Sequence, residues 1–403
     1  MKIGIIRETK VPEDNRVALA PEQVKMLSGK YPNDKIVVQS SEIRAFTDEE
    51  YRKEGVEVVS NIDDCDVLFG IKEAKIETLI PNKHYFFFGH IAKFQEYNKS
   101  LCKALLTKKI TFCDYEYLVD ENEQRVCAFG WWAGVVGVYY TLRGYGIREN
   151  LFELPKPDRR FTLEQLLKNL QSIKLPAIKL LVTGRGRVSQ GDQYVLDNIG
   201  VEKISNEEYL NTKIVAKCSY TVATTESLVK RKDLEAFNNS DFKLHPELYE
   251  SDFEKWYKTT DVLISCHFWD SKAPVYLSKQ NLKDPNIKIR MIGDVTCDIC
   301  GSIESTLRAS THDKPYYDYN VETEQEELAF SNKRNITVMA VDTCPNALAI
   351  DTSRYFGEML IEHVFVPLLN GEKSNVINCS TIMTNGKYTS KFSYLKSFVK
   401  DEL

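Results

Sequence analysis

Residues 178–200 read IKLLVTGRGRVSQGDQYVLDNIG and carry the strongest structural pattern in the chain. The first six form a largely apolar run that is rich in β-branched side chains, which is typical of a buried parallel strand. Gly184-Arg185-Gly186-Arg187 then supplies residues that can take positive φ and let backbone approach a ligand. From Gly191 the pattern continues at helical spacing, with Val195, Leu196 and Ile199 on one face. We therefore predict a strand, a glycine turn and a helix.

This order suits a dinucleotide, because the first N–H groups of the helix and its dipole favour a pyrophosphate. Two glycines in such a turn also occur in other α/β proteins, and the fingerprint is imperfect. Ser189 stands at the third glycine position. Ser205 or Asn206 stands where an acid for the ribose is expected, unless the second strand, 201–204, runs on to Glu207 or Glu208. The expected cofactor is NAD, with NADP left open, and the predicted binding residues here are Gly184, Arg185, Gly186, Arg187, Val188 and Ser205.

Composition describes an ordinary globular protein of two domains. The chain has 403 residues, 43% apolar and 28% charged, with a net charge of -5. No basic excess points to nucleic acid or an anionic membrane, and no apolar run approaches the roughly 18 residues that span a bilayer. Without a signal peptide, we expect a cytoplasmic monomer or homodimer whose ten cysteines stay reduced. The pair Cys297 and Cys300 lacks further ligands, so no metal site is expected, and KDEL at 400–403 is expected to be coincidental.

Strands alternate with helical segments along the chain, which predicts an α/β protein with two doubly wound, Rossmann-like parallel-sheet domains and a cleft between them. We place the substrate domain at 1–134 and 345–403, because a final helix pair from about Ala347 should return to it, and the dinucleotide-binding domain at 135–344. An apolar helix is expected over 128–143, followed after Gly144 by a polar linker. Residues 230–256 are charged and aromatic and predict an insertion on the rim of the second domain.

Reactive side chains follow several strands of the first domain. Lys72 and Glu73 come after 67–70, His90 after 85–89 and Glu116 after 110–114. Ligands of parallel sheets bind outside the carboxyl ends of the strands. An amine must lose a proton before hydride leaves its carbon, and the imine must then be hydrolysed. A lysine and a histidine with carboxylates near them suit these proton transfers. The arginines that would bind substrate carboxylates are Arg16 and Arg125.

Several motifs carry a family resemblance. They are RETK at 7–10, NRVALAP at 15–21, GIKE at 70–73, FGH at 88–90, DYE at 114–116, RVCAFG at 125–130, GDVT at 293–296 and MAVD at 339–342 followed by Pro345. Together they span nearly the whole chain. The sequence resembles the alanine dehydrogenases, transhydrogenase alpha subunits and lysine-forming saccharopine dehydrogenases, and among these it is most similar to the last, chiefly through Arg125 followed by Ala-Phe-Gly.

The resemblance implies an NAD-dependent oxidoreductase that converts saccharopine to L-lysine and 2-oxoglutarate, reversibly. Lys72 would take the amine proton, His90 would act as acid and base in hydrolysis, and Glu73 and Glu116 would tune both. Arg16, Arg125 and Phe129 would contact substrate, and Cys266, Asp294 and Asp342 would lie near the cofactor. Thr183 and Ser205 depart from the family pattern, so an alanine-type or opine-type amino acid substrate is an alternative. A non-catalytic nucleotide-binding module is the second alternative.

Overall fold

The computed structural model describes residues 1–399, so the terminal KDEL lies outside it. The chain forms two compact units. Unit 1 comprises Met1–Phe129 and the chain from Leu348 onward, and unit 2 comprises Gly130–Ala347. The units therefore change at residues 129/130 and 347/348, close to the division predicted from the sequence at 134/135 and 344/345.

Unit 1 is built on an eight-stranded sheet in the order β18-β17-β6-β5-β4-β1-β2-β3. The first six strands in the chain pair in parallel, and β17 and β18 add an antiparallel edge. Most positions of the central strands β1, β4 and β5 are buried, as expected for a sheet covered on both faces. The strands are β1 (Lys2–Ile5), β2 (Lys35–Gln39), β3 (Glu57–Val59), β4 (Val67–Phe69), β5 (His84–Phe87), β6 (Thr111–Asp114), β17 (Thr381–Thr384) and β18 (Lys387–Tyr388).

The helix that follows unit 2 in the chain belongs to unit 1 and packs against its first helix. The N–H of Val17 donates to Ser353 Oγ at 3.0 Å, and Gln23 Nε2 donates to the carbonyl of Arg354 at 2.8 Å. Both acceptors lie on α12, which runs beside α1. The helices of unit 1 are α1 (Pro21–Lys30), α2 (Asp48–Lys53), α3 (Lys99–Thr107), α12 (Ala349–Leu360), α13 (Val366–Leu369), α14 (Asn375–Ser380) and α15 (Lys396–Val399).

Unit 2 holds a second eight-stranded sheet, in the order β15-β14-β16-β13-β12-β7-β9-β8. The second strand along the chain, β8, lies at the edge, and β9 occupies the place beside β7. This order differs from the usual dinucleotide-binding sheet, in which the second strand is the neighbour of the first. The strands are β7 (Lys179–Thr183), β8 (Glu202–Lys203), β9 (Ser219–Ala223), β12 (Val262–Ser265), β13 (Met291–Asp294), β14 (Tyr316–Tyr319), β15 (Glu326–Glu327) and β16 (Ile336–Met339).

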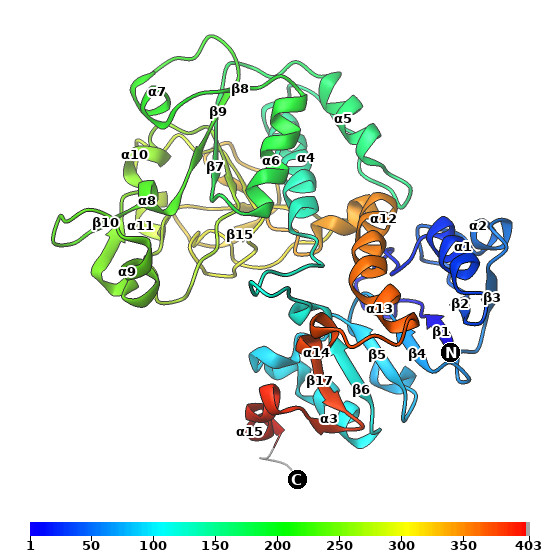
Figure 1. The fold of residues 1–403 in the computed structure, drawn as a ribbon. Helices are drawn as coiled ribbons and strands as arrows, with labels where there is room; N and C mark the ends of the chain where they lie inside the picture. Colours follow the sequence, from blue (N-terminus) through cyan, green and yellow to red (C-terminus); the bar gives the residue numbers. More distant parts are fainter. Residues whose placement is uncertain (400–403) are drawn as a thin grey trace. The chain divides into compact units, whose positions relative to one another are not determined.

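Helices α4 (Gly130–Glu149) and α6 (Arg187–Asn198) lie side by side over one face of this sheet (Figure 1). Their backbones nearly touch, since a Cβ on Gly134 would come within 1.9 Å of the Val188 carbonyl and one on Gly191 within 2.0 Å of the Trp131 carbonyl. The other helices of unit 2 are α5 (Leu163–Gln171), α7 (Asn206–Asn211), α8 (Thr225–Leu228), α9 (Asn239–Leu244), α10 (Glu254–Tyr257) and α11 (Lys279–Leu282).

Two predicted helix boundaries were wrong. The helix after the glycine turn begins at Arg187 rather than Gly191, so Arg187 is helical. The apolar helix α4 continues to Glu149, and the predicted polar linker after Gly144 starts later. Gly144 does not end the helix because it is a packing position: a Cβ there would meet Met291 Cε at 2.7 Å.

The segment 230–256 is not an addition to the rim. It contains an antiparallel pair of strands, β10 (Val229–Arg231) with β11 (Tyr249–Ser251), and continues into α10. Tyr249, Phe253 and Trp256 are buried in the second core cluster with Leu263 of β12. The aromatic residues that suggested a surface insertion therefore belong to the core of unit 2 on the face opposite α4 and α6. No helix within the described residues is long and apolar enough to cross a membrane.

Candidate functional site

The topological switch point of unit 1 brings the predicted chemistry together. The chain leaves β1 toward β2 on one side and later returns to β4 on the other, and ligands of such sheets bind outside the carboxyl ends at this point. Glu8 joins the two loops there, because its carboxylate accepts the N–H of Ile71 at 2.7 Å and that of Lys72 at 2.9 Å. Burial raises the pKa of Glu8, and the charge of Asp14 adds to this effect. The sequence analysis did not single out Glu8.

Lys72 follows β4 and lies among other cations. Burial lowers the pKa of its ammonium, and the charges of Arg16 and Lys10 lower it further. Both effects penalise the protonated form. A lowered pKa makes the neutral amine of Lys72 easier to form, and the neutral amine is the form that accepts a proton.

His90 is held by a carboxylate on the neighbouring loop. Its Nδ1 lies 2.6 Å from Glu73 Oε1, and Lys10 Nζ donates to Glu73 Oε2 at 2.9 Å. Burial opposes ionisation of Glu73, but the hydrogen bonds and charges of His90 and Lys10 lower its pKa to about 2. A carboxylate on Nδ1 fixes the ring, and Nε2 has no hydrogen-bond partner among the described residues. His90 can therefore exchange a proton through Nε2.

Asp114, the last residue of β6, positions His90 through its backbone. Asp114 Oδ2 accepts the N–H of His90 at 3.1 Å and that of Gly89 at 3.2 Å. His90 takes the left-handed conformation with φ of 51°, which a non-glycine residue adopts only when its surroundings hold it there. Burial raises the pKa of Asp114 to about 6. Sequence reasoning quoted this residue only as part of a motif.

Arg16 is buried, with 3% of the residue exposed, and it is paired with Asp14. Its Nε and Nη2 donate to the two Asp14 oxygens at 2.9 and 2.5 Å, and its guanidinium lies 4.3 Å from the centre of the Phe129 ring. This arrangement leaves the Nη1 edge to meet a ligand. Asp14 was missed because a carboxylate in a polar loop carries no sequence signal of its own.

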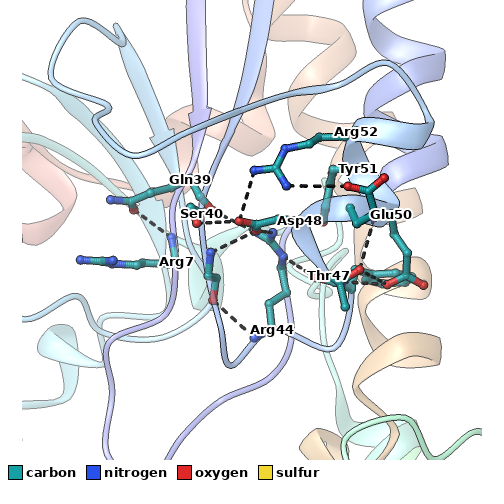
Figure 2. A network of polar contacts seen from close by, with 12 residues as sticks. Arg7, Gln39, Ser40, Arg44, Thr47, Asp48, Glu50, Tyr51 and Arg52 are labelled. Carbon is teal, nitrogen blue, oxygen red and sulfur yellow. Dashed lines mark hydrogen bonds and ion pairs between the residues drawn. The ribbon is translucent and has the colours of Figure 1, made fainter.

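The loop carrying Arg16 is supported by the network in Figure 2. Arg44 donates to Asp48 Oδ1 at 2.6 Å and to the carbonyls of Gln39 and Phe46. The loop ordered in this way holds Asn15, whose Nδ2 donates to the carbonyl of Ile43 at 2.6 Å. Figure 2 also shows Arg7, the other arginine near β1, with its guanidinium directed away from this network.

Glu116 lies apart from the His90–Glu73 pair. It accepts Lys93 Nζ at 2.5 Å and Arg125 Nη2 at 2.9 Å, both on Oε1. Its second oxygen is buried without a hydrogen-bond partner in the described structure. Glu116 thus positions Arg125, whose side chain is 44% exposed. The backbone N–H of Glu116 donates to Asp114 Oδ1 at 2.9 Å. The contacts of Glu116 are with cations rather than with His90.

The switch point of unit 2 lies between β7 and β12, and glycines line it. Gly184 has φ of 89°, and a Cβ there would lie 2.8 Å from His267 Cα. Gly186 is the N-cap of α6, no side chain caps that helix, and a Cβ on Gly186 would meet nothing within 4 Å. Open helix N–H groups beside a close backbone approach fit a pyrophosphate. Thr183 joins the two strand ends, since its Oγ1 accepts the N–H of Cys266 at 3.1 Å.

A cavity of about 690 Å³ opens at this switch point. The predicted residues Gly184, Arg185, Gly186, Arg187 and Val188 line it together with Cys266. Its far wall comes from α9 in the 230–256 segment, which sequence reasoning did not connect with the cofactor. Helix α9 contributes Asn239, Phe242, Lys243 and Leu244, and the turn after it contributes Pro246.

The remaining predicted cofactor residues occupy different environments. Asp294 is buried, and both its oxygens are used: Oδ1 accepts Thr296 Oγ1 and Oδ2 accepts Thr306 Oγ1, each at 2.6 Å. Asp342 is exposed on the turn after β16. Ser205 caps α7 at the end of β8, where its Oγ accepts the N–H of Glu208 at 3.1 Å. No cluster of metal-ligating side chains occurs within residues 1–399.

A family model described as "Alanine dehydrogenase/PNT, N-terminal domain" matches residues 4–136, which contain Lys72, His90 and Arg16. This segment of the chain is therefore similar to the N-terminal domain of the alanine dehydrogenase/PNT family. The solved structure of an L-alanine dehydrogenase covers 99% of the chain with a TM-score of 0.66 at 16% identity, so it shares the fold of two mainly parallel sheets. This match confirms the predicted fold class.

Among curated relatives, an alpha-aminoadipic semialdehyde synthase of Arabidopsis thaliana is 29% identical over 98% of the chain. The chain spans only 41% of that relative's length. A saccharopine dehydrogenase (NAD⁺, L-lysine-forming) of Candida glabrata is 24% identical, with 88% of each chain covered. The chain is thus similar to saccharopine dehydrogenases, as the sequence motifs indicated.

Proposed function

We propose that this chain is a nicotinamide-dependent dehydrogenase that oxidises the secondary amine of saccharopine and hydrolyses the imine to L-lysine and 2-oxoglutarate, reversibly. The observation that carries the proposal is the presence, at one switch point, of a lysine whose pKa is lowered by burial and a histidine oriented by Glu73. The match to saccharopine dehydrogenases over most of both chains supports the substrate class.

A nicotinamide ring, when bound, would accept hydride from the carbon next to the substrate nitrogen. The residues of the glycine turn fit such a cofactor, because Gly184 and Gly186 leave room at the start of α6. Gly184 to Val188 would hold its pyrophosphate, as α6 offers unsatisfied N–H groups there.

Proton transfers would fall to unit 1. Lys72 Nζ, in its neutral form, would take the proton of the substrate ammonium, so that the nitrogen lone pair becomes available as the C–H bond breaks. His90 Nε2 would take a proton from the water that attacks the imine carbon and then deliver one to the departing amine of lysine. Glu73 would stabilise the imidazolium that forms between these steps.

Substrate carboxylates would be bound by arginines. Arg16 would offer its Nη1 edge, since Asp14 already occupies Nε and Nη2. Arg125, held by Glu116 and partly exposed, would bind a second carboxylate. A substrate with several carboxylates, such as saccharopine, uses both arginines, whereas alanine has one carboxylate to offer.

The test is an absorbance assay at the nicotinamide band with saccharopine and either NAD⁺ or NADP⁺, with lysine identified as product. We expect saccharopine to be turned over and alanine to be turned over far more slowly. Turnover of alanine in preference to saccharopine would favour the alanine-type alternative. Dinucleotide binding without turnover of either amino acid would favour a non-catalytic module.

A further inference from the structure

A hollow in unit 1 lies at the carboxyl ends of β1, β2 and β3, apart from the residues proposed for the reaction. Its volume is about 520 Å³, which falls within the usual range for sites that bind small molecules. The chain that follows these strands lines it, together with residues 77–81 after β4. Lys72, His90, Arg16 and Arg125 are not among the residues that line it.

The floor of this hollow is apolar and its rim is charged. Ile62 and Leu79 are buried side chains of the floor. Arg7, Asp63 and Glu77 are exposed and also line the hollow. The rim therefore offers one guanidinium and two carboxylates above an apolar surface.

The charges of the rim are not neutralised by one another. Figure 2 shows the Arg7 guanidinium directed away from the ion pairs of α2. Asp63 Oδ2 accepts Asn61 Nδ2 at 3.0 Å, and this donor carries no charge. Arg7, Asp63 and Glu77 form no ion pair within residues 1–399. Because the guanidinium is not paired with either carboxylate, a single ligand can bind both kinds of charge at once.

A short segment after β1 connects the hollow to the loop that carries the proposed proton acceptor. Arg7 and Thr9 line the hollow. Glu8 and Lys10 contact the loop 71–73 through hydrogen bonds of 2.7 to 2.9 Å. Successive side chains of an extended segment point to opposite sides, which accounts for this alternation. A ligand that binds Arg7 and Thr9 therefore contacts the same segment that holds the loop.

We propose that this hollow is an effector site for a basic α-amino acid, that is, a molecule with one carboxylate and two amino groups. Arg7 would bind the carboxylate, and Asp63 and Glu77 would bind the two ammonium groups. The additional positive charge of such a ligand complements the additional negative charge of the rim. Its methylene groups would lie on the apolar floor. The site goes beyond the proposed function, because it takes no part in the reaction.

Calorimetric titration of the full chain with L-lysine, L-norleucine and 1,5-diaminopentane tests the charge requirement without any turnover. L-norleucine lacks the second ammonium group, and the diamine lacks the carboxylate. We expect L-lysine to bind at least about fivefold more tightly than either, because each of them loses a charge-assisted contact. Equal affinities of the three compounds, or no detectable binding of L-lysine, would overturn the proposal.

Variants separate this site from the substrate site of the proposed function, where L-lysine is a product. Arg7→Met and Glu77→Gln should each weaken the binding of L-lysine in the hollow at least about fivefold. Arg125→Met should change it less than about twofold. Arg52→Met removes an exposed arginine of α2 outside the hollow and is the matched control for Arg7→Met. Loss of L-lysine binding in Arg125→Met alone would place the ligand in the substrate site and overturn the proposal.

The link to the loop is tested by NMR of protein labelled with ¹³C-histidine. The ring signal of His90 is identified by its loss in His90→Gln. In Arg125→Met, L-lysine should shift this signal, and in the Arg7→Met/Arg125→Met double variant the shift should disappear. A His90 signal that stays in place at saturating L-lysine would overturn the effector role. Saccharopine turnover enters none of these measurements, so this proposal and the proposed function fail separately.

Discussion

At the switch point of unit 1, several charged groups are paired with one another: Glu73 with His90 and Lys10, and Arg16 with Asp14. At the switch point of unit 2, the turn is made of glycines and the helix start is uncapped. Both edges sit at the same place in a parallel sheet. The paired charges of unit 1 hold proton-transfer groups in fixed states, whereas the open donors of unit 2 are available to a phosphorylated ligand.

The largest expected effect comes from removing the proton-transfer groups. Lys72→Met and His90→Gln should each lower kcat by about 10²- to 10⁴-fold, the usual contribution of general acid–base catalysis. Steady-state kinetics with saccharopine measure this effect. Lys75→Met, an exposed lysine on the same loop, is the matched control and should retain normal turnover. Wild-type kcat values in both Lys72→Met and His90→Gln would contradict the proposed proton-transfer roles of these residues.

Breaking the buried pair of unit 1 should cost stability. Asp14→Ala leaves the Arg16 guanidinium buried without its partner, so the free energy of unfolding should fall by about 3–5 kcal/mol. Glu54→Ala, which removes an exposed pair with Lys25, should change it by less than about 1 kcal/mol. Urea unfolding followed by fluorescence compares the two. Similar losses would show that Asp14 is not needed to compensate Arg16.

The pairing of Glu73 predicts a pH effect. Its pKa of about 2 in the folded protein lies below its ordinary value of 4.5, so its contribution to stability is present above about pH 5 and lost as the pH falls toward 2. The contribution amounts to about 3 kcal/mol at neutral pH. Glu73→Gln should therefore make stability less dependent on pH between 5 and 2. An unchanged acid limb in the unfolding titration would refute this assignment.

A smaller effect on stability is expected from substitutions in the glycine turn of unit 2, and it should differ between Gly184 and Gly186. Gly184→Ala places a Cβ 2.8 Å from His267 Cα at positive φ and should destabilise the fold by about 1–3 kcal/mol. Gly186→Ala meets nothing within 4 Å and should leave the melting temperature near that of the wild type. Both should weaken dinucleotide binding, Gly186→Ala because its Cβ enters the ligand space. Equal melting temperatures for the two variants would show that the close approach at Gly184 is relaxed easily.

Strand-end positions were the part of the site that the sequence could predict. Lys72 and His90 follow recognisable apolar strands, so their place at one edge follows from parallel topology alone. The roles of three carboxylates could not be predicted, because their contacts are not encoded in the local sequence pattern. They are Asp14, Asp114 and Glu8.

The fold class was predictable from alternating strands and helices, but the strand order was not. Local pattern shows that β8 and β9 exist without showing which of them lies beside β7. The end of the apolar helix was predicted too early, because Gly144 was interpreted as a helix end. In the structure Gly144 lies inside the helix and packs against Met291. Aromatic residues such as Trp256 looked like surface additions since their core partners come from other strands.

The central claim is that unit 1 provides the proton-transfer groups and unit 2 binds the dinucleotide. The dinucleotide affinity of the Lys72→Met/His90→Gln double variant tests this claim most directly. Fluorescence titration with NADPH and NADH should give dissociation constants within about twofold of the wild type for each nucleotide, although turnover is lost. A loss of affinity of tenfold or more would mean that the proton-transfer groups of unit 1 also carry cofactor binding, and it would contradict the account.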